Sequence, residues 1–228
     1  MCPTLRAEKT TLRWRLQSLA AATILFLAVT GLARAEPIKI SAFGDSSLYG
    51  GGEAYRTGRF SGVPVAEAFP AKLERALRAR GWDVAVSNNA VPGRRAGAGL
   101  GAIFQIPVGT KLTIVRFGGL DLRLDKAGPE QVASYLSQVI DAVHQKGSAV
   151  ILVKEWFGRQ PVLDAIGNKA DFYAAWWVGL NIADRVPRPE YDAGDGEHLN
   201  AAGTDIVVAR AVPDVERVLT AFGLKPGS

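Results

Sequence analysis

The sequence contains very few of the residues that build metal sites and disulfide frameworks. Its 228 residues include one cysteine, Cys2, and two histidines, His144 and His198. Cys2 lies in a segment that we expect to be removed, so the remaining chain cannot depend on disulfides. His144 falls near the end of a predicted helix, where a solvated histidine is typical. We therefore expect no metal site and no cofactor.

The chain also lacks a large excess of positive charge outside its first segment. The formal net charge is +5, but residues 1–35 carry five basic residues and one acidic residue. The remainder carries 22 basic and 21 acidic residues. A nearly neutral chain gives no reason to expect a nucleic acid or an anionic membrane surface as a partner. We expect neither.

Residues 1–35 have the organisation of a signal peptide. A basic stretch from Arg6 to Arg15 precedes an uncharged apolar run from Leu19 to Leu32, which is short for a membrane span. Ala-Arg-Ala at 33–35 then matches the small-x-small cleavage pattern. We predict cleavage after Ala35 and a periplasmic or secreted product with no stable membrane span. An uncleaved membrane anchor is the alternative.

Residues 36–228 are predicted to form one domain, because 193 residues suffice for a substantial core and no linker or repeat interrupts them. Apolar, β-branched runs alternate with runs of helical period. Strands are predicted at 38–43, 82–86, 112–117 and 149–153. Helices are predicted at 66–80, 132–145, 171–184 and from 201 onward, with Pro213 ending or kinking the last one. A polar, glycine-rich stretch at 50–62 is predicted to be a mobile loop. This alternation predicts an α/β fold with a mainly parallel sheet between helices.

Three residues near opposite ends of this domain could form a nucleophilic site. Ser46 directly follows the first predicted strand, and Asp195 and His198 lie just before the last helix. A serine hydroxyl needs a base to remove its proton, and the base needs a group that fixes its tautomer. If residues 195–198 form a helical turn, Asp195 and His198 share one side of it and could reach Ser46 across the sheet edge. The alternative is an ordinary turn at Ser46 and a surface histidine near a helix cap.

Four sequence blocks resemble those of the GDSL/SGNH hydrolases, the lysophospholipase L1-like esterases. Gly-Asp-Ser-Ser-Leu-Tyr-Gly at 44–50 is similar to their nucleophile block, and Asn-Asn-Ala-Val-Pro-Gly at 88–93 to their second block. Phe-Gly-Gly-Leu-Asp at 117–121 aligns with the third, usually Gly-x-Asn-Asp, and Asp-Gly-Glu-His-Leu-Asn at 195–200 with the fifth. The resemblance spans most of residues 36–228. It implies a three-layer α/β/α sandwich of the flavodoxin-like type.

The resemblance also implies roles for individual residues. Ser46 would be the nucleophile, His198 the base and Asp195 its partner, with the backbone N–H groups of Ser46 and Gly93 in the oxyanion hole. The family's third donor is an asparagine side chain, and Leu120 stands at that position. Leucine cannot donate a hydrogen bond, and losing one such donor typically costs about 10²- to 10³-fold in rate. Asn88 or Asn89 could substitute for it.

Other residues near these blocks are candidates for substrate binding. Arg94 and Arg95 follow Gly93 and could bind an anionic group of a substrate, or they could form a solvated basic turn. Leu120 would contact substrate from the third block. Aromatic side chains precede residues 195–198, and one of them could form a wall for an acyl chain or a sugar ring, the rest being core. They are Trp156, Phe157, Tyr173, Trp176 and Trp177. Gly-Ala-Gly-Leu-Gly-Ala at 97–102 superficially matches a dinucleotide fingerprint, but it does not open the first βα turn, so we reject nucleotide binding.

The sequence thus predicts an exported serine esterase of the SGNH type. Its expected substrate is a small-molecule, lipid or glycan ester, cleaved through an acyl-enzyme on Ser46. Two other interpretations stay open. One is a carbohydrate O-acetylesterase. The other is a non-catalytic binding protein on the same scaffold, because Leu120 weakens the expected oxyanion hole.

Overall fold

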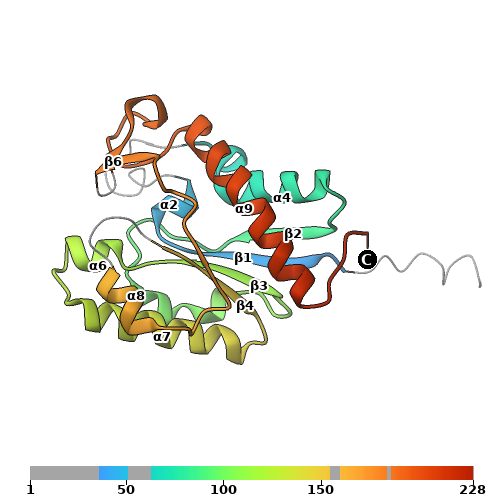
Figure 1. Cartoon of the computed structure of the whole chain (residues 1–228), viewed down its shortest axis with the longest axis horizontal. Helices are drawn as coiled ribbons and strands as arrows, with labels where there is room; N and C mark the ends of the chain where they lie inside the picture. The colour runs from blue at the N-terminus through green and yellow to red at the C-terminus, as the bar shows by residue number, and fades with distance from the viewer. Residues whose placement is uncertain (1–35, 51–62, 155–159, 184–185, 228) are drawn as a thin grey trace, which may run out of the picture. The chain divides into compact units, whose positions relative to one another are not determined.

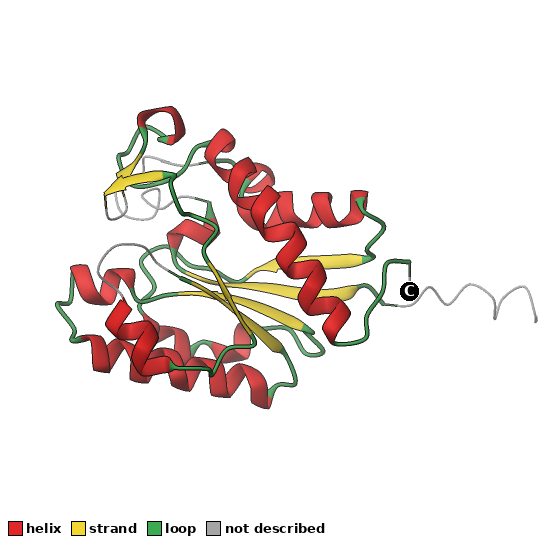
Figure 2. Ribbon diagram, viewed as in Figure 1, coloured by secondary structure: helices red, strands yellow, loops and turns green. Residues whose placement is uncertain are grey.

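The computed structural model describes residues 36–50, 63–154, 160–183 and 186–227. The predicted signal peptide, nearly all of the predicted loop at 50–62, and Trp156 and Phe157 lie outside these ranges. Within them, five parallel strands form one sheet in the order β2-β1-β3-β4-β5 (Figure 2). The strands are β1 (Ile38–Gly44), β2 (Val84–Asn88), β3 (Leu112–Arg116), β4 (Ala149–Val153) and β5 (Phe172–Ala174). The predicted α/β/α fold with a parallel sheet is confirmed.

Helices cover both faces of this sheet (Figure 1). Those on one face are α4 (Phe69–Ala79) and α9 (Ala201–Ala221). Those on the other are α5 (Ala96–Gly101), α7 (Pro129–Gln145) and α8 (Gln160–Ile166). Short helices α2 (Ser46–Tyr49) and α6 (Gly119–Arg123) follow β1 and β3. A small antiparallel pair, β6 (Asn181–Ala183) with β7 (Val186–Pro187), lies between β5 and α9 in the chain.

The two cores follow from the period-2 alternation of the strands. In β3, Leu112 and Ile114 pack toward α4 and α9, whereas Val115 packs toward α7. Strand β4 repeats the pattern, with Ile151 on the first face and Leu152 on the second. Because both faces are covered by helices, the interior strands β1, β3 and β4 are mostly apolar. A buried charge in such a strand is therefore unusual.

The strand order determines where a site can form. The chain moves outward from β1 to β2, then returns across β1 to β3, so the connections leave in opposite directions at the β1/β3 boundary. Ligands of doubly wound sheets bind in the crevice that opens at the carboxyl ends of strands at such a switch point. Ser46 follows β1, and Arg116 is the last residue of β3. The switch point thus coincides with the predicted nucleophile.

One predicted helix is wrong, and one of the two effects predicted for Pro213 does not occur. Of the predicted helix at 171–184, the described residues 171–183 form no helix: they contain β5 and β6, and Trp176 and Trp177 lie in the turn between these strands. The aromatic residues there pack at the end of the sheet, and this tertiary environment outweighs the helical period. Pro213 does not end the last helix, since α9 runs from Ala201 to Ala221. Flanking residues Ala211, Val212 and Val215 are buried on the sheet, and that packing retains the helix despite the missing N–H.

In the described ranges, no helix combines the length and the apolar content needed to cross a bilayer.

Candidate active site

Ser46 lies on a tight turn that the chain makes as it leaves β1. Asp45 caps helix α2, with its carboxylate accepting the Ser47 N–H at 2.9 Å. The turn closes at Gly50, whose φ of 109° suits glycine. Gly44 is required for a different reason, because a Cβ there would lie 2.6 Å from the Arg116 carbonyl oxygen. The turn therefore packs directly against the end of β3.

Asp195 and His198 lie on a loop that is closed by its own hydrogen bonds. Asn200 N–H donates to Tyr191 C=O at 2.7 Å, and Ala193 N–H donates to His198 C=O at 2.9 Å. Asp195 accepts the N–H of His198 at 2.8 Å. The predicted helical turn at 195–198 is wrong, and an Asx-type turn brings the two side chains together instead.

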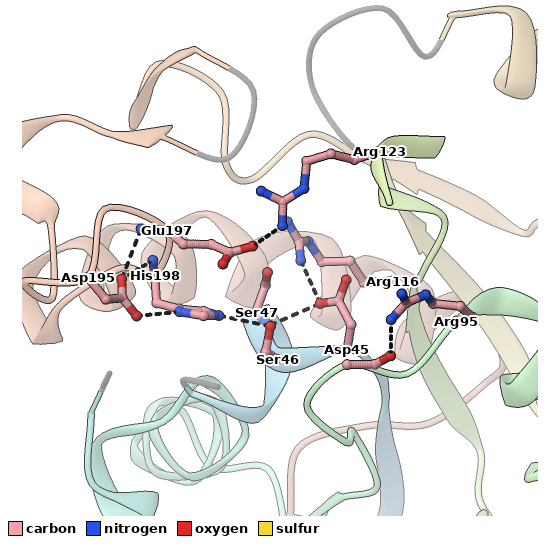
Figure 3. Close-up of polar contacts among 10 residues, drawn as sticks. Asp45, Ser46, Ser47, Arg95, Arg116, Arg123, Asp195, Glu197 and His198 are labelled. Atoms are coloured by element: carbon pink, nitrogen blue, oxygen red, sulfur yellow. Dashed lines mark hydrogen bonds and ion pairs between the residues drawn. The ribbon is translucent and has the colours of Figure 1, made fainter. Parts of the chain in front are cut away.

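The three predicted residues form one hydrogen-bond chain (Figure 3). Asp195 Oδ2 lies 2.6 Å from His198 Nδ1, and His198 Nε2 lies 2.8 Å from Ser46 Oγ. With the Nδ1 proton donated to the carboxylate, Nε2 is free to accept the Ser46 hydroxyl proton. Ser46 and His198 are buried, at 4% and 7% exposure. This arrangement can activate a serine hydroxyl as a nucleophile.

A cleft opens beside Ser46 and His198 on the side of the sheet covered by α4 and α9. Its lining mixes apolar and polar side chains. The described residues that line it are Ser46, Ser47, Gly50, Phe69, Arg116, Trp177, Asn181, Glu197, His198, Leu199, Thr204 and Val207. Glu197 accepts a hydrogen bond from Arg123, the last residue of α6, at 2.7 Å (Figure 3). This ion pair joins the loop that carries His198 to the end of α6.

The residues that we predicted to form or to complete the oxyanion hole differ in their contacts. Gly93 has φ = 78°, and its carbonyl accepts a hydrogen bond from Arg95 at 2.7 Å. Leu120 is buried, at 6% exposure, and is not among the described residues that line the cleft. Asn88 and Asn89 direct their amide donors to the carbonyls of Tyr49 and Gln105. In this structure each asparagine amide donates to a loop carbonyl, and a role for either as a replacement donor stays a prediction.

Arg94 and Arg95 both contact protein groups. Arg94 donates to Asn89 C=O at 2.7 Å and to Gln105 Oε1 at 2.6 Å, and burial lowers its pKa. Arg95 forms a bidentate pair with Asp125, at 2.9 and 3.1 Å. The hydrogen bond from Arg95 lowers the pKa of Asp125. Both arginines therefore stabilise the segment around Gly93, and a role for them or for Leu120 in binding substrate stays a prediction.

Asp121 supports the same segment from the third block. It is 3% exposed, and its carboxylate accepts the Ala96 N–H at 3.0 and 3.1 Å. Burial raises the pKa of this carboxyl group. This contact anchors the start of α5 to α6, directly after the loop that carries Gly93.

Sequence reasoning missed the buried pair between Asp45 and Arg116. Arg116 Nη1 lies 2.9 Å from Asp45 Oδ1, and the two side chains are 6% and 1% exposed. The guanidinium also lies over the Trp177 ring, with Cζ 4.7 Å from the centroid. A signal was present, because Arg116 is the only charged residue in the apolar run Leu112–Phe117. Its partner, 71 positions away, depends on strand order.

Comparisons with known proteins bear on the fold. No protein-family model matches the chain, and no curated protein matches it. Among solved structures, AlinE4, an SGNH-hydrolase family esterase, is 25% identical with a TM-score of 0.56, covering 82% of this chain and 99% of its own. EstA, a psychrotrophic esterase from Pseudoalteromonas, is 12% identical with a TM-score of 0.61, covering 80% of this chain and 99% of its own. Est24, a carbohydrate acetylesterase from Sinorhizobium meliloti, is 13% identical with a TM-score of 0.60, covering 79% and 99%. The chain has the fold that these esterases share.

Proposed function

We propose that this chain, a serine hydrolase of the SGNH type, hydrolyses carboxylic esters through an acyl-enzyme at Ser46. The observation that carries the proposal is the continuous hydrogen-bond chain from Asp195 through His198 to Ser46 Oγ. It lies at the switch point of the sheet, beside a cleft, where substrates of doubly wound folds bind.

The geometry supports a two-step reaction. Ser46 Oγ attacks the ester carbonyl carbon as His198 Nε2 takes the hydroxyl proton, and Asp195 stabilises the resulting imidazolium. Collapse of the tetrahedral intermediate breaks the bond to the alcohol, which leaves with the proton from His198. A water molecule then attacks the acyl-enzyme, His198 again accepts and returns a proton, and the acid is released with Ser46 restored.

Stabilisation of the oxyanion would come from the backbone N–H groups of Ser46 and Gly93. The support is indirect: Asp45 and Arg95 hold the two turns that carry these groups. Leu120 offers no third donor, so we expect slower turnover than in a site that has the same two backbone donors and an asparagine amide as well. Two donors still suffice for catalysis, because the enzyme also gains from proximity and general-base activation.

The alternatives have weaker support. A non-catalytic binding protein has no need of a buried serine aligned with a histidine–aspartate pair. A carbohydrate O-acetylesterase was suggested by an aromatic wall for a sugar ring. Trp177 does line the cleft, but the guanidinium of Arg116 covers its ring, so it offers no open platform. We therefore favour simple acyl esters as substrates.

We also propose export. The support is the organisation of residues 1–35, with a basic start, an apolar run and Ala-Arg-Ala at its end. A periplasmic or secreted location would place the esterase where it can meet esters outside the cytoplasm.

The direct test is hydrolysis of p-nitrophenyl acetate by residues 36–228 and by Ser46→Ala. We expect the variant to lose at least about 10³-fold in kcat, because no other hydroxyl replaces the nucleophile. Ser47→Ala is the matched control, since it removes the neighbouring hydroxyl of the same turn and should keep most activity. Equal, background-level rates for wild type and Ser46→Ala would contradict the proposed function.

A further inference from the structure

Arg116 is a buried cation beside the nucleophile whose position calls for an explanation. It ends strand β3 and lines the cleft together with Ser46 and His198. The residue is 5% exposed. Moving a charge out of water costs free energy that only good geometry and hydrogen bonding repay. Because apolar residues of similar size often stabilise a protein equally well, stability alone is a weak explanation for a buried ion pair.

The contacts of Arg116 lead directly to the nucleophile turn. Its Nη1 donates to Asp45 Oδ1 at 2.9 Å, and the same carboxylate oxygen accepts the Ser47 N–H at 2.9 Å. Arg116 C=O accepts the Asp45 N–H at 3.2 Å. Arg116 therefore contacts both the carboxylate of Asp45 (Figure 3) and its backbone N–H, and Asp45 is the residue directly before Ser46.

The guanidinium itself is held in one orientation. Its Cζ lies over the ring of Trp177, 4.7 Å from the centroid, while its Nη1 donates to Asp45 Oδ1 at 2.9 Å. Trp177 in turn packs on Phe69 of α4, with ring centroids 6.1 Å apart. A planar donor that contacts an aromatic ring and a carboxylate together is a role that arginine fills better than lysine. Asp45 is thus held by a group that is itself immobilised by the core.

We propose that Arg116 is a positioning residue for Ser46, acting through Asp45; the inference rests on the esterase function proposed above. Arg116 fixes the Asp45 carboxylate, the carboxylate fixes the start of helix α2, and α2 fixes Ser46. The Ser46 hydroxyl must meet His198 Nε2 and the Ser46 N–H must meet the oxyanion. With no amide at position 120, the placement of this N–H matters more. A displacement of about 1 Å at a reacting group can cost about 10²-fold in rate.

The test is a double-mutant cycle in residues 36–228. The variants are Arg116→Met, Arg116→Lys, Asp45→Asn and the double variant Asp45→Asn/Arg116→Met. We would measure kcat and KM for p-nitrophenyl acetate, the rate at which diethyl p-nitrophenyl phosphate modifies Ser46, and the melting temperature. Thr113→Val is the matched control, because it removes a buried hydrogen bond to Ser148 from the same strand, away from the carboxyl edge.

We expect Arg116→Met to lower kcat and the modification rate of Ser46 about 10- to 100-fold, with KM within about 3-fold of wild type. Arg116→Lys should recover only part of the loss, because it restores the charge without the planar guanidinium and its fixed donor directions. If Arg116 acts through Asp45, its loss adds little once Asp45 is changed, so the double variant should match Asp45→Asn within about 3-fold. Thr113→Val should lower the melting temperature and leave kcat unchanged.

Other outcomes would overturn the inference. One such outcome in Arg116→Met is that fewer molecules react at Ser46 with diethyl p-nitrophenyl phosphate while kcat per reactive molecule equals that of wild type. This result would mean that Arg116 only keeps the protein folded. A raised KM with unchanged kcat would make it a substrate-binding residue. If Arg116→Met does not fold, the double variant, which lacks both charges, is compared with Asp45→Asn; a further loss of kcat much larger than about 3-fold in the double variant contradicts the coupling. If wild type hydrolyses no ester but Ser46 is phosphorylated, the proposed function fails and the modification rates still test the inference. If neither occurs, both fail.

Discussion

Leucine at position 120 is the residue that we expect to limit the catalytic efficiency of the proposed site. It is buried at the start of α6, in the block where related hydrolases carry an amide. Its side chain can exclude water, but it can donate nothing to a developing oxyanion. The remaining candidate donors are backbone groups, whose positions depend on the residues that hold their turns.

Leu120→Asn is expected to raise kcat for p-nitrophenyl acetate about 10-fold or more, because one oxyanion donor is worth about 10²- to 10³-fold when well placed. Leu120→Ala is the control, since it removes the leucine without adding a donor. A rise with both variants would indicate relief of crowding. An unchanged kcat for Leu120→Asn in a folded protein would show that position 120 does not face the oxyanion.

Arg95→Gln is expected to lower kcat about 3- to 10-fold, because Arg95 holds the Gly93 carbonyl at 2.7 Å and a loosened loop offers its N–H less precisely. Steady-state kinetics on p-nitrophenyl acetate would measure this. Arg78→Gln is a matched control, since Arg78 likewise donates to a backbone carbonyl, that of Val84, but outside the site. Equal effects of both changes would attribute the loss to general destabilisation.

At the scale of elements, helical period and apolar, β-branched runs predicted the long helices α4, α7 and α9 and the strands β1 to β4, but neither the short helices nor β5. The residues at 171–184 were the main error, because their aromatic spacing fits a helix as well as a packed turn between short strands. Trp176 illustrates the cause. It is 2% exposed, and its ring centroid lies 5.7 Å from that of Phe69. Its Nε1 donates to Asp214 of α9 at 2.8 Å. Its conformation is determined by partners that are distant in the sequence.

A contact between the end of α4 and helix α9 should make the stability of the protein depend on pH. Glu216 of α9 accepts hydrogen bonds from Arg80 Nε at 2.6 Å and from Trp82 Nε1 at 3.0 Å. The hydrogen bond from Arg80 lowers the pKa of Glu216. A carboxyl group with a lowered pKa in the folded state adds stability above its unfolded pKa, and this is lost as pH falls through the folded pKa.

Glu216→Gln is therefore expected to lower the free energy of unfolding by about 1 kcal/mol at pH 7, since one partner is exposed. Urea unfolding at several pH values would measure it. The difference from wild type should shrink toward zero as pH falls through the lowered folded pKa of Glu216, because the native glutamate then becomes protonated as well. Glu130→Gln, on the first turn of α7, is a charge-matched control. A pH-independent difference would assign the effect to packing.

For the whole molecule, the strand order explains why distant residues meet. Ser46 and His198 are 152 positions apart, yet they lie at one edge because β1 is an interior strand and the loop before α9 places His198 against the turn that follows β1. The same order brings Arg116 next to Asp45, since Gly44 and Arg116 are paired residues in the β1/β3 register. The site therefore depends on the order and register of the strands, and no single segment of the chain forms it.

The proposed export is tested on the whole chain. Expressed from Met1 in a bacterium, the protein should appear in the periplasm or medium with Glu36 as its first residue, which N-terminal sequencing and mass would establish. Deletion of residues 1–35 is the control and should retain the protein in the cytoplasm. Recovery of the full-length chain in the membrane fraction would instead identify an uncleaved anchor.

The sequence by itself determined the α/β class and the identity of the serine, histidine and aspartate. Local period and residue chemistry are sufficient for these, because both are properties of neighbouring residues. The tertiary structure alone decided the rest. It determined that Asp195 and His198 meet on a hydrogen-bonded loop and not on a helical turn. It also paired Arg116 with Asp45 and turned Arg94 and Arg95 toward protein acceptors. Such contacts depend on which strands adjoin, and no local pattern encodes that.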